Sequence, residues 1–434
     1  MSDVVKTTLP VRDIKRDIKQ VPARFDSVLA PKPNGHATKT DVFEKAFAFT
    51  RADEAEAAGM HPYFKAIASQ HGGTVEVAGR TMIITGSNDY LGLTQDQRLK
   101  NAAREALNLF GTSCTGSRFL TGTLTLHEEL ERHLAEFLHK EAALTFSAGF
   151  LGCLAVLSAL TGRHDILYFD RENHACLYDG ARLSFGALRK YEHNDIEDLD
   201  RLLARDADKP GGRMIVTDGV FSMSGHIADL PNIVRVARKH GARVVVDDAH
   251  ATGVLGEGGR GVAEHFGLED EVDLIVGTFS KSFASVGGFM AGNRAVVNYV
   301  KHKARPFIFT AALPAMQMAA ALQALQIMKS EPWHRETLWH NVASLRGGLQ
   351  SLGFDTLGSQ TPIVPVLIGD DELTLMFWKG LWEAGVFTTP ALPPGVPMGA
   401  SIIRTSVNAN HTGEQLDALL EAFHGVGRSL GVIA

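Results

Sequence analysis

The chain has 434 residues, with 43 Lys+Arg against 49 Asp+Glu, a formal net charge of -6, 45% hydrophobic and 21% charged residues. This composition is typical of a soluble globular protein with a large core, and the acidic balance argues against nucleic acid as a partner. The cysteines, Cys114, Cys153 and Cys176, stand far apart without a CxxC pair. They therefore indicate neither a disulfide framework nor a cysteine zinc site, and no metal is expected.

The first 60 residues are polar and charged, with few large apolar side chains. This pattern predicts an arm or short helices outside the main core. The chain lacks the apolar region of a secretory signal and a run of about 18 apolar residues that could span a membrane. We therefore expect no transmembrane segment and a location in the cytoplasm.

The residue pattern changes near Val77, where TVEVAGRTMIITG predicts a hairpin with alternating apolar positions. Further on, the runs DILYFD, MIVTDGV, ARVVVDDAH and VDLIVGTFSK are apolar nearly throughout and alternate with amphipathic segments such as IEDLDRLLARD. Such runs predict an α/β fold whose central, mostly parallel sheet is covered on both faces. The domains expected are an arm over residues 1–60, a large domain over 61–313 and a smaller C-terminal α+β domain over 314–434.

Polar residues at the ends of these strands are the first candidates for a site, because ligands bind beyond the carboxyl ends of parallel strands. Asp247 closes ARVVVD, and it is either a turn former or the partner of a cationic ring nitrogen. Lys281 follows VDLIVGTFS, and it is either a solvated lysine or an amine that forms a Schiff base. His174 follows DILYFD, where a structural role is also open.

Two further segments are suited to holding an anion or a ring substituent. SAGFLG, at residues 147–152, runs into the helical sequence CLAVLSAL, so its backbone N–H groups can face a phosphate at the positive end of a helix. GVFSMSG places Ser222 at the end of the strand MIVTDGV. By contrast, HEELERHL departs from the zinc motif HExxH, because Glu131 stands where the second histidine belongs.

Seven motifs in fixed order carry a family resemblance: SNDYLGL, TGSRFLTGT, NHACLYDG, GVFSMSGHIADLP, VVVDDAHATGVLG, GTFSKSFASVGG and RPFIFTAALP. From about residue 60 to the C-terminus the chain resembles the α-oxoamine synthases, which are fold-type I pyridoxal-phosphate enzymes. Within the family it is most similar to the soluble bacterial serine palmitoyltransferases, although SNDYLGL is shared with 8-amino-7-oxononanoate synthase. The resemblance implies a central seven-stranded-type sheet, a pyridoxal 5'-phosphate cofactor and a homodimer with active sites at the subunit interface.

The resemblance also implies roles for individual residues. Lys281 would bind the cofactor covalently and later move protons at the substrate α-carbon, and Asp247 would keep the pyridine nitrogen protonated. His174 matches the histidine that stacks on the ring, and His250 the one near its phenolic oxygen. The other matched positions are Ser222 near the same oxygen, Thr278, Ser280, Gly149 and Phe150 at the phosphate, Thr310 at the phosphate of the neighbouring subunit, and Arg404 and Asn88 at the amino-acid carboxylate.

The implied reaction is a decarboxylating condensation of an amino acid with an acyl thioester, carried by acyl-CoA or acyl carrier protein. Serine and a long-chain acyl-CoA are favoured, giving a 3-oxo-amine such as 3-ketodihydrosphingosine for sphingolipid synthesis. In soluble serine palmitoyltransferases the loop before the carboxylate-binding arginine carries Arg-Pro-Pro, but here Leu392 stands in place of that arginine. The amino acid is thus either held by Arg404 alone or different from serine.

Other readings remain open. The chain could be an 8-amino-7-oxononanoate synthase-like enzyme or a glycine or alanine C-acyltransferase. It could also be an aminotransferase or simple decarboxylase on the same fold, because fold does not settle chemistry. A non-catalytic partner subunit is disfavoured, because the chain retains Lys281.

Overall fold

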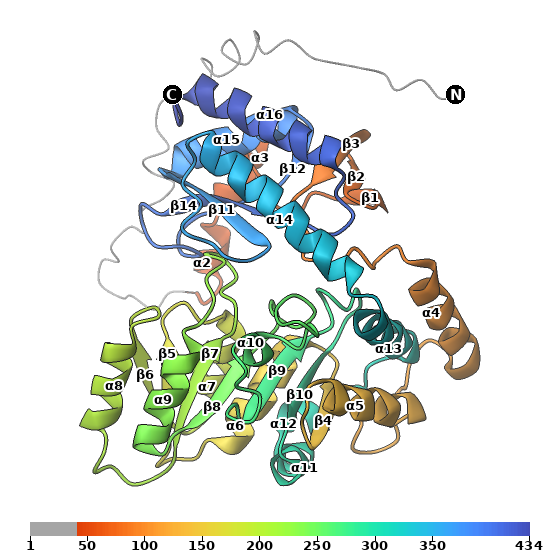
Figure 1. The fold of residues 1–434 in the computed structure, drawn as a ribbon, viewed down its shortest axis with the longest axis vertical. Helices are drawn as coiled ribbons and strands as arrows, with labels where there is room; N and C mark the ends of the chain where they lie inside the picture. Colours follow the sequence, from red (N-terminus) through yellow and green to blue (C-terminus); the bar gives the residue numbers. More distant parts are fainter. Residues whose placement is uncertain (1–40) are drawn as a thin grey trace.

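The computed structural model describes residues 41–434. The largest sheet in this part of the chain has seven strands in the order β4-β10-β9-β8-β7-β5-β6 (Figure 1). The strands are β4 (Ala142–Phe146), β5 (Ile166–Asp170), β6 (Ala187–Tyr191), β7 (Arg213–Asp218), β8 (Arg243–Asp247), β9 (Leu274–Thr278) and β10 (Gly288–Gly292). Strand β10 runs antiparallel to β4 and β9, whereas β9, β8, β7, β5 and β6 run parallel to one another. The predicted mostly parallel sheet is confirmed.

Helices cover both faces of this sheet. On one face α6 packs directly on the strands, and α7, α11 and α12 pack against α6. The opposite face is covered by α5, α8 and α9. Outside α5 lies α13, and α4 packs against α13. Their bounds are α4 (Gln97–Phe110), α5 (Thr125–Phe137), α6 (Gly149–Leu160), α7 (Ala175–Leu183), α8 (Ile196–Arg205), α9 (Leu230–His240), α10 (Val262–His265), α11 (Arg294–Lys303), α12 (Arg305–Ile308) and α13 (Ala315–Ser330).

The central strands are apolar throughout because each contributes to two cores. In β8 the side chain of Val245 joins the apolar cluster on the α6 face, whereas Val244 and Val246 join the cluster on the α9 face. Successive side chains of a strand point to opposite faces, so a sheet covered twice needs apolar residues at every position. This physical requirement is what made the strands recognisable in the sequence.

A smaller region, formed by residues 67–84 together with the chain after α13, contains two further sheets. One has the order β11-β14-β13 and the other β1-β2-β3-β12. The strands are β1 (Ile67–His71), β2 (Thr74–Val77), β3 (Arg80–Ile84), β11 (Ile363–Gly369), β12 (Val386–Phe387), β13 (Thr389–Ala391) and β14 (Ser401–Ser406), and the helices are α14 (Trp333–Ser351), α15 (Asp371–Glu383) and α16 (Gly413–Leu430). The predicted smaller C-terminal domain of mixed helices and strands is thus present.

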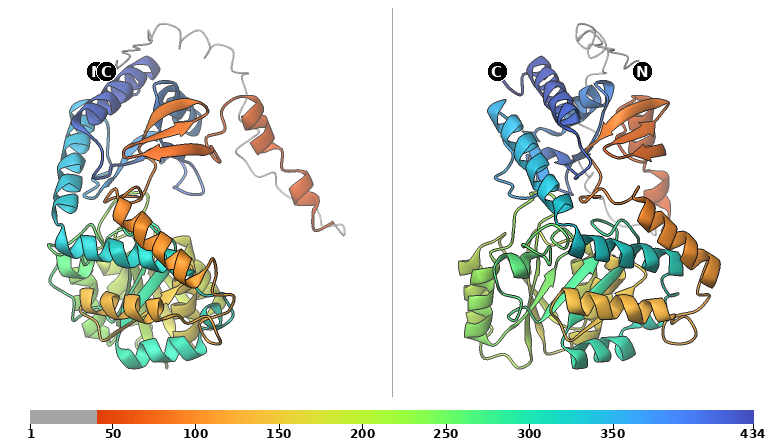
Figure 2. Two further views of the ribbon diagram at one scale, coloured as in Figure 1. Left: turned by 90° about the vertical axis from the view of Figure 1, so that its right-hand side faces the viewer. Right: turned by 45° about the vertical axis from the view of Figure 1, so that its right-hand side comes forward.

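The predicted hairpin is confirmed as β2 and β3, joined by Ala78 and Gly79, both at positive φ. Its partner comes from far along the chain, because β3 pairs in parallel with β12 through Ile83 and Val386. Figure 2 shows this orange hairpin beside the blue C-terminal elements. Residues 67–84 therefore associate with C-terminal strands, while the boundaries at 60 and 313 stay a prediction.

The arm expected over residues 1–60 is described from residue 41 onward, and residues 1–40 lie outside the described residues. The described part forms two short helices, α2 (Glu44–Phe47) and α3 (Arg51–Ala57), neither of which has a buried residue. In Figure 2 they project from the body of the molecule. Among residues 41–434, none of the helices has the length and apolar character that crossing a membrane requires.

Candidate active site

The carboxyl ends of the parallel strands open onto one cavity of about 290 Å³. Asp218 at the end of β7 is in register with Asp247 at the end of β8, which is in register with Val276 of β9. The predicted residues that line the cavity are Gly149, Phe150, His174, Asp247, His250, Thr278, Ser280 and Lys281. The structure therefore brings together the amine and the carboxylate on which the sequence interpretation depends.

Lys281 lies at this cavity just beyond β9. Burial lowers the pKa of Lys281 to about 8, despite the opposing effect of the Asp247 and Asp218 carboxylates. A lysine in this range has a usable fraction of neutral, nucleophilic amine near pH 7. Sequence reasoning did not single out Asp218, whose own pKa is raised by burial and by the nearby Asp247 charge.

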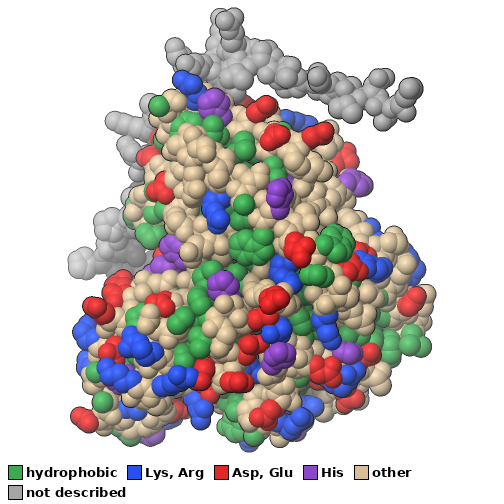
Figure 3. All heavy atoms as spheres, in the orientation of Figure 1, with side chains coloured by type: hydrophobic (Ala, Val, Ile, Leu, Met, Phe, Trp, Pro, Cys, Tyr) green, Lys and Arg blue, Asp and Glu red, His purple; other side chains and the backbone are tan. Residues whose placement is uncertain are grey.

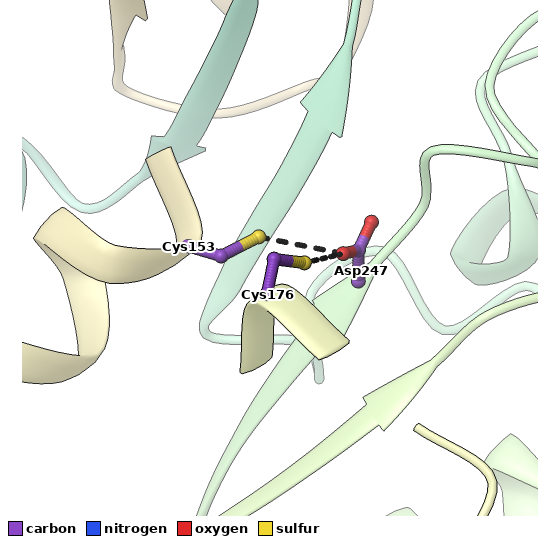
Figure 4. A group of neighbouring side chains, drawn as sticks. All are labelled: Cys153, Cys176 and Asp247. Atoms are coloured by element: carbon purple, nitrogen blue, oxygen red, sulfur yellow. Dashed lines mark hydrogen bonds between the residues drawn. The ribbon is translucent and has the colours of Figure 1, made fainter. Parts of the chain in front are cut away.

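Asp247 is held on both of its carboxylate oxygens. The backbone N–H of Ala249 donates to Oδ1 at 3.1 Å, and the thiols of Cys153 and Cys176 donate to Oδ2 at 3.4 and 3.6 Å. Figure 4 shows the two sulfurs directed at this carboxylate from separate helices. Sequence patterns do not reveal this arrangement, since the two cysteines share no local motif.

His174 is the N-cap of α7, because its Nδ1 accepts a hydrogen bond from the backbone N–H of Cys176 at 3.3 Å. The same nitrogen lies 2.9 Å from the Cys176 sulfur, and this contact raises the pKa of His174. The cap directs the imidazole to the cavity that Asp247 also lines. A ring bound over Asp247 would meet the His174 imidazole.

His250 is buried and neutral. Burial is the main cause that lowers the pKa of His250 well below its ordinary value, and the nearby Lys281 and Arg404 cations lower it further. The hydroxyl of Tyr90 lies 2.7 Å from Nδ1 of His250. Burial raises the pKa of Tyr90 to about 12, so the phenol keeps its proton and can donate it to Nδ1. The tautomer with a proton on Nε2 then presents a donor to the cavity.

The predicted substrate arginine lies beside this network and does not line the cavity itself. Arg404 of β14 donates from Nε to the carbonyl of Ser222 at 2.7 Å and from Nη2 to Oδ1 of Asn88 at 3.1 Å. Tyr90 links the arginine to the cavity, because its hydroxyl lies 3.4 Å from the same Asn88 oxygen. Ser222 therefore contributes a backbone contact to Arg404 and is not a residue of the cavity wall.

A candidate cradle for a phosphate forms where α6 begins. A Cβ added to Gly149 would lie 2.8 Å from Cβ of Thr278, so glycine is required for this close approach. The hydroxyl groups of Thr278 and Ser280 lie 2.7 Å apart beside it. The N-terminus of a twelve-residue helix together with two hydroxyl groups is a site that favours an anion.

Two predicted positions lie elsewhere. Thr310 does not line the Lys281 cavity; together with Arg118 and Ser147 it lines a small cleft of its own. Leu392 lies on a second, apolar cavity of about 390 Å³ beside Met60 and Met376. Leucine suits the mostly apolar lining of this cavity, whose wall also carries Glu372.

Residues 80–423 match the family "Aminotransferase class I and II". The chain belongs to this family.

Individual relatives are more specific than the family match. The chain is 45% identical to a serine palmitoyltransferase of Bacteriovorax stolpii, over 88% of this chain and 91% of the relative. It is 43% identical to an 8-amino-7-oxononanoate synthase of Thermoanaerobacter pseudethanolicus, over 91% of this chain and 100% of the relative. The solved serine palmitoyltransferase of Sphingomonas wittichii superposes with a TM-score of 0.87 at 37% identity, over 91% of this chain and 100% of that one. The chain is thus close to two kinds of α-oxoamine synthase.

Members of this fold-type I group depend on pyridoxal phosphate, and one similar solved structure is described as holding it as an internal aldimine. The residues present fit the cofactor. The Gly149 cradle fits its phosphate, Lys281 its aldehyde and Asp247 its pyridine nitrogen, each on the wall of one cavity. His174 also lines this cavity, where it would lie against the ring.

Proposed function

We propose that this protein is a pyridoxal-phosphate-dependent acyltransferase that condenses an amino acid with an acyl thioester and releases carbon dioxide. Serine and a long-chain acyl-CoA are the favoured substrates, with a 3-oxo-amine as the product. The observation that carries the proposal is the joining of Lys281 and Asp247 in one cavity. Beside it lie the hydrogen bond between Tyr90 and His250 and the hydrogen bond from Arg404 to Asn88. The 45% identity to a serine palmitoyltransferase supports the choice of substrates.

The residues divide the chemistry between them. Bound pyridoxal phosphate supplies an electron sink for a carbanion at the α-carbon of the amino acid. Asp247, fixed through Ala249 and the two thiols, holds a proton at the pyridine nitrogen. The neutral Lys281 amine accepts the proton from the α-carbon, which its lowered pKa makes possible near pH 7.

Arg404 selects which bond breaks. Its Nε is occupied by the Ser222 carbonyl, and Nη2 also bonds Asn88. The remaining N–H groups of the guanidinium are available to a carboxylate, and a fixed carboxylate orients the bonds at the α-carbon relative to the ring. The same grip holds the carboxylate that later leaves as carbon dioxide.

The test is direct. Purified protein loaded with pyridoxal phosphate is titrated with serine, glycine and alanine while the absorbance of the cofactor is followed. Each amino acid is then combined with an acyl-CoA, and the release of free CoA is measured. We expect serine to perturb the spectrum at the lowest concentration and to release CoA with long-chain acyl donors. Turnover with an amino acid and a keto acid alone, or no thiol release from any CoA or carrier-protein donor, would refute the proposal.

A second candidate is an 8-amino-7-oxononanoate synthase-like activity, because a relative with that name is 43% identical over 91% of this chain. Leu392 favours it in one respect, since the arginine of the serine palmitoyltransferase loop is absent. The same titration separates the two, because tightest binding of an amino acid other than serine would favour this second candidate.

We also propose that the enzyme is a homodimer with active sites at the subunit interface. Thr310 lies outside its own chain's Lys281 cavity, and the neighbouring Phe309 is 76% exposed. This is the placement expected of a residue that serves the partner's phosphate. Sedimentation of the loaded protein at the mass of one chain would refute this proposal. The location in the cytoplasm stays a prediction.

A further inference from the structure

Two cysteines from different helices meet at the carboxylate that ends β8. Cys153 lies on α6 and Cys176 on α7, and both are free thiols. The helices approach closely at Gly180, where an added Cβ would lie 3.0 Å from the carbonyl oxygen of Cys153. The two sulfurs and Asp247, shown in Figure 4, are all buried.

The spacing of these groups matches the first coordination sphere of zinc. Zn–S bonds of about 2.3 Å and Zn–O bonds of about 2.0 Å put sulfur and oxygen about 3.5 Å apart at a tetrahedral angle. The sulfurs of Cys153 and Cys176 lie 3.4 and 3.6 Å from Oδ2 of Asp247. One donor atom from each of the three residues lies within 4.8 Å of the others.

A fourth donor atom, the nitrogen Nδ1 of His174, and an entry path for the ion are also present. Nδ1 of His174 lies 2.9 Å from the Cys176 sulfur, and it reaches a cation held by the other three groups when it gives up the hydrogen bond from the Cys176 backbone N–H. All four residues line the cavity of about 290 Å³, through which an ion can enter. Two thiolates, an imidazole and a carboxylate form a donor set that selects Zn²⁺-like cations over Mg²⁺ or Ca²⁺.

We propose that the protein without its cofactor binds one thiophilic divalent cation of the zinc class through Cys153, Cys176, Asp247 and His174. Binding replaces the two S–H protons with metal–sulfur bonds and releases both protons to solvent. The two thiolates and the carboxylate carry more negative charge than the divalent cation neutralises. The remaining negative charge lies beside Lys281, and the ammonium form of Lys281 offsets it.

The cation and pyridoxal phosphate exclude one another. This part rests on the proposed function, in which Asp247 faces the pyridine nitrogen and His174 faces the ring. A carboxylate oxygen that coordinates a metal cannot also hold the pyridinium proton. The cavity therefore has two alternative occupants, and a zinc-loaded chain cannot take up its cofactor.

The experiment uses the full chain freed of pyridoxal phosphate and titrated with Co²⁺, whose thiolate complexes absorb in the near ultraviolet. We expect one Co²⁺ per chain, with the thiolate band and the visible bands of a tetrahedral site, and displacement of Co²⁺ by Zn²⁺. C153S and C176S each weaken binding by at least about 100-fold, since each removes a thiolate ligand. C114S is the matched control, because Cys114 contacts the carbonyl of Leu313 and does not line this cavity.

The outcomes separate the metal site from the proposed function. Absence of the thiolate band in the wild-type chain, or its survival in the C153S/C176S double variant, overturns the metal site. Circular dichroism and pyridoxal-phosphate uptake by that double variant establish that it folds. If pyridoxal phosphate binds while Co²⁺ stays bound through both sulfurs, the metal site stands, whereas the exclusion and the assignment of Asp247 to the pyridine nitrogen fail.

Discussion

The hydroxyl of Tyr90 lies 2.7 Å from Nδ1 of His250, although the two residues are 160 positions apart in the chain. This contact joins the loop after β3 to the loop after β8. It fixes the imidazole orientation in the cofactor cavity. The same hydroxyl lies 3.4 Å from the Asn88 oxygen that accepts a hydrogen bond from Arg404.

Replacing Tyr90 with phenylalanine removes this hydrogen bond and leaves the buried His250 nitrogen without its partner. We expect Y90F to lower the free energy of unfolding by about 1–3 kcal/mol and to change the absorbance and pH titration of the bound cofactor. The matched control is Y168F, because Tyr168 is equally buried and its hydroxyl contacts Asp206 at 3.3 Å, outside the cavity. A cofactor spectrum unchanged in Y90F would contradict the role given to this contact.

The lowered pKa of Lys281 predicts the pH dependence of cofactor uptake. The neutral amine attacks the aldehyde, so the rate of covalent attachment to the cofactor-free chain should rise with pH and level off above about 8. A lysine with its ordinary pKa would show a rise that continues to about 10. Stopped-flow absorbance measures the rate, with K281A as the variant that cannot form the bond.

The same shift predicts a stability effect with a definite sign. Between pH 8 and the ordinary lysine pKa, the unfolded chain binds more protons at position 281 than the folded chain. The free energy of unfolding of the cofactor-free protein should therefore increase with pH across this window. Denaturant titrations of wild type and K281M test this, and equal slopes with pH in the two proteins would contradict it.

Arg404 should govern amino-acid affinity and leave cofactor affinity unchanged. We expect R404K to raise the amino-acid Kd by about 100-fold, because lysine cannot grip a carboxylate with two parallel N–H bonds. Spectral titration of the loaded enzyme measures this Kd. R132K is the control, since Arg132 is an exposed partner of Glu136 on α5.

Leu392 tests whether Arg404 holds the carboxylate alone. Because Leu392 lies on the apolar cavity beside Met60, L392R should change the serine Kd by less than about threefold, or ~0.6 kcal/mol. The same spectral titration decides the matter. A tenfold gain in affinity would show that position 392 reaches the substrate after all.

The buried ion pair between Arg118 and Glu131, next to β4, should contribute strongly to the free energy of unfolding. The two atoms Nη1 and Oε1 lie 2.7 Å apart in buried surroundings, and Glu131 also accepts from the backbone N–H of Thr145. We expect E131Q to lower the free energy of unfolding by about 3 kcal/mol, because it leaves the arginine charge buried and unpaired. E136Q, at an exposed position of the same helix, should unfold like wild type.

On the face shown in Figure 3, acidic and basic side chains are interspersed over the sheet domain. Such a surface has no extended region of one sign to steer a polyanionic acyl donor over long distances. The rate constant for acyl-CoA binding should accordingly fall only modestly with added salt. A steep fall would indicate a basic surface elsewhere on the assembled enzyme.

The sequence by itself determined the sheet, the hairpin and the residues at the strand ends. A sheet covered on both faces demands apolar residues at every position, and polar residues at its carboxyl edge stand out against them, which is why Asp247, His174 and Lys281 could be chosen. Only the tertiary structure decided what surrounds them. Tyr90 and the two thiols at Asp247 come from segments that share no local periodicity with the strand ends. Such contacts depend on how close helix packing and loop geometry place distant side chains, and local patterns carry no information about that distance.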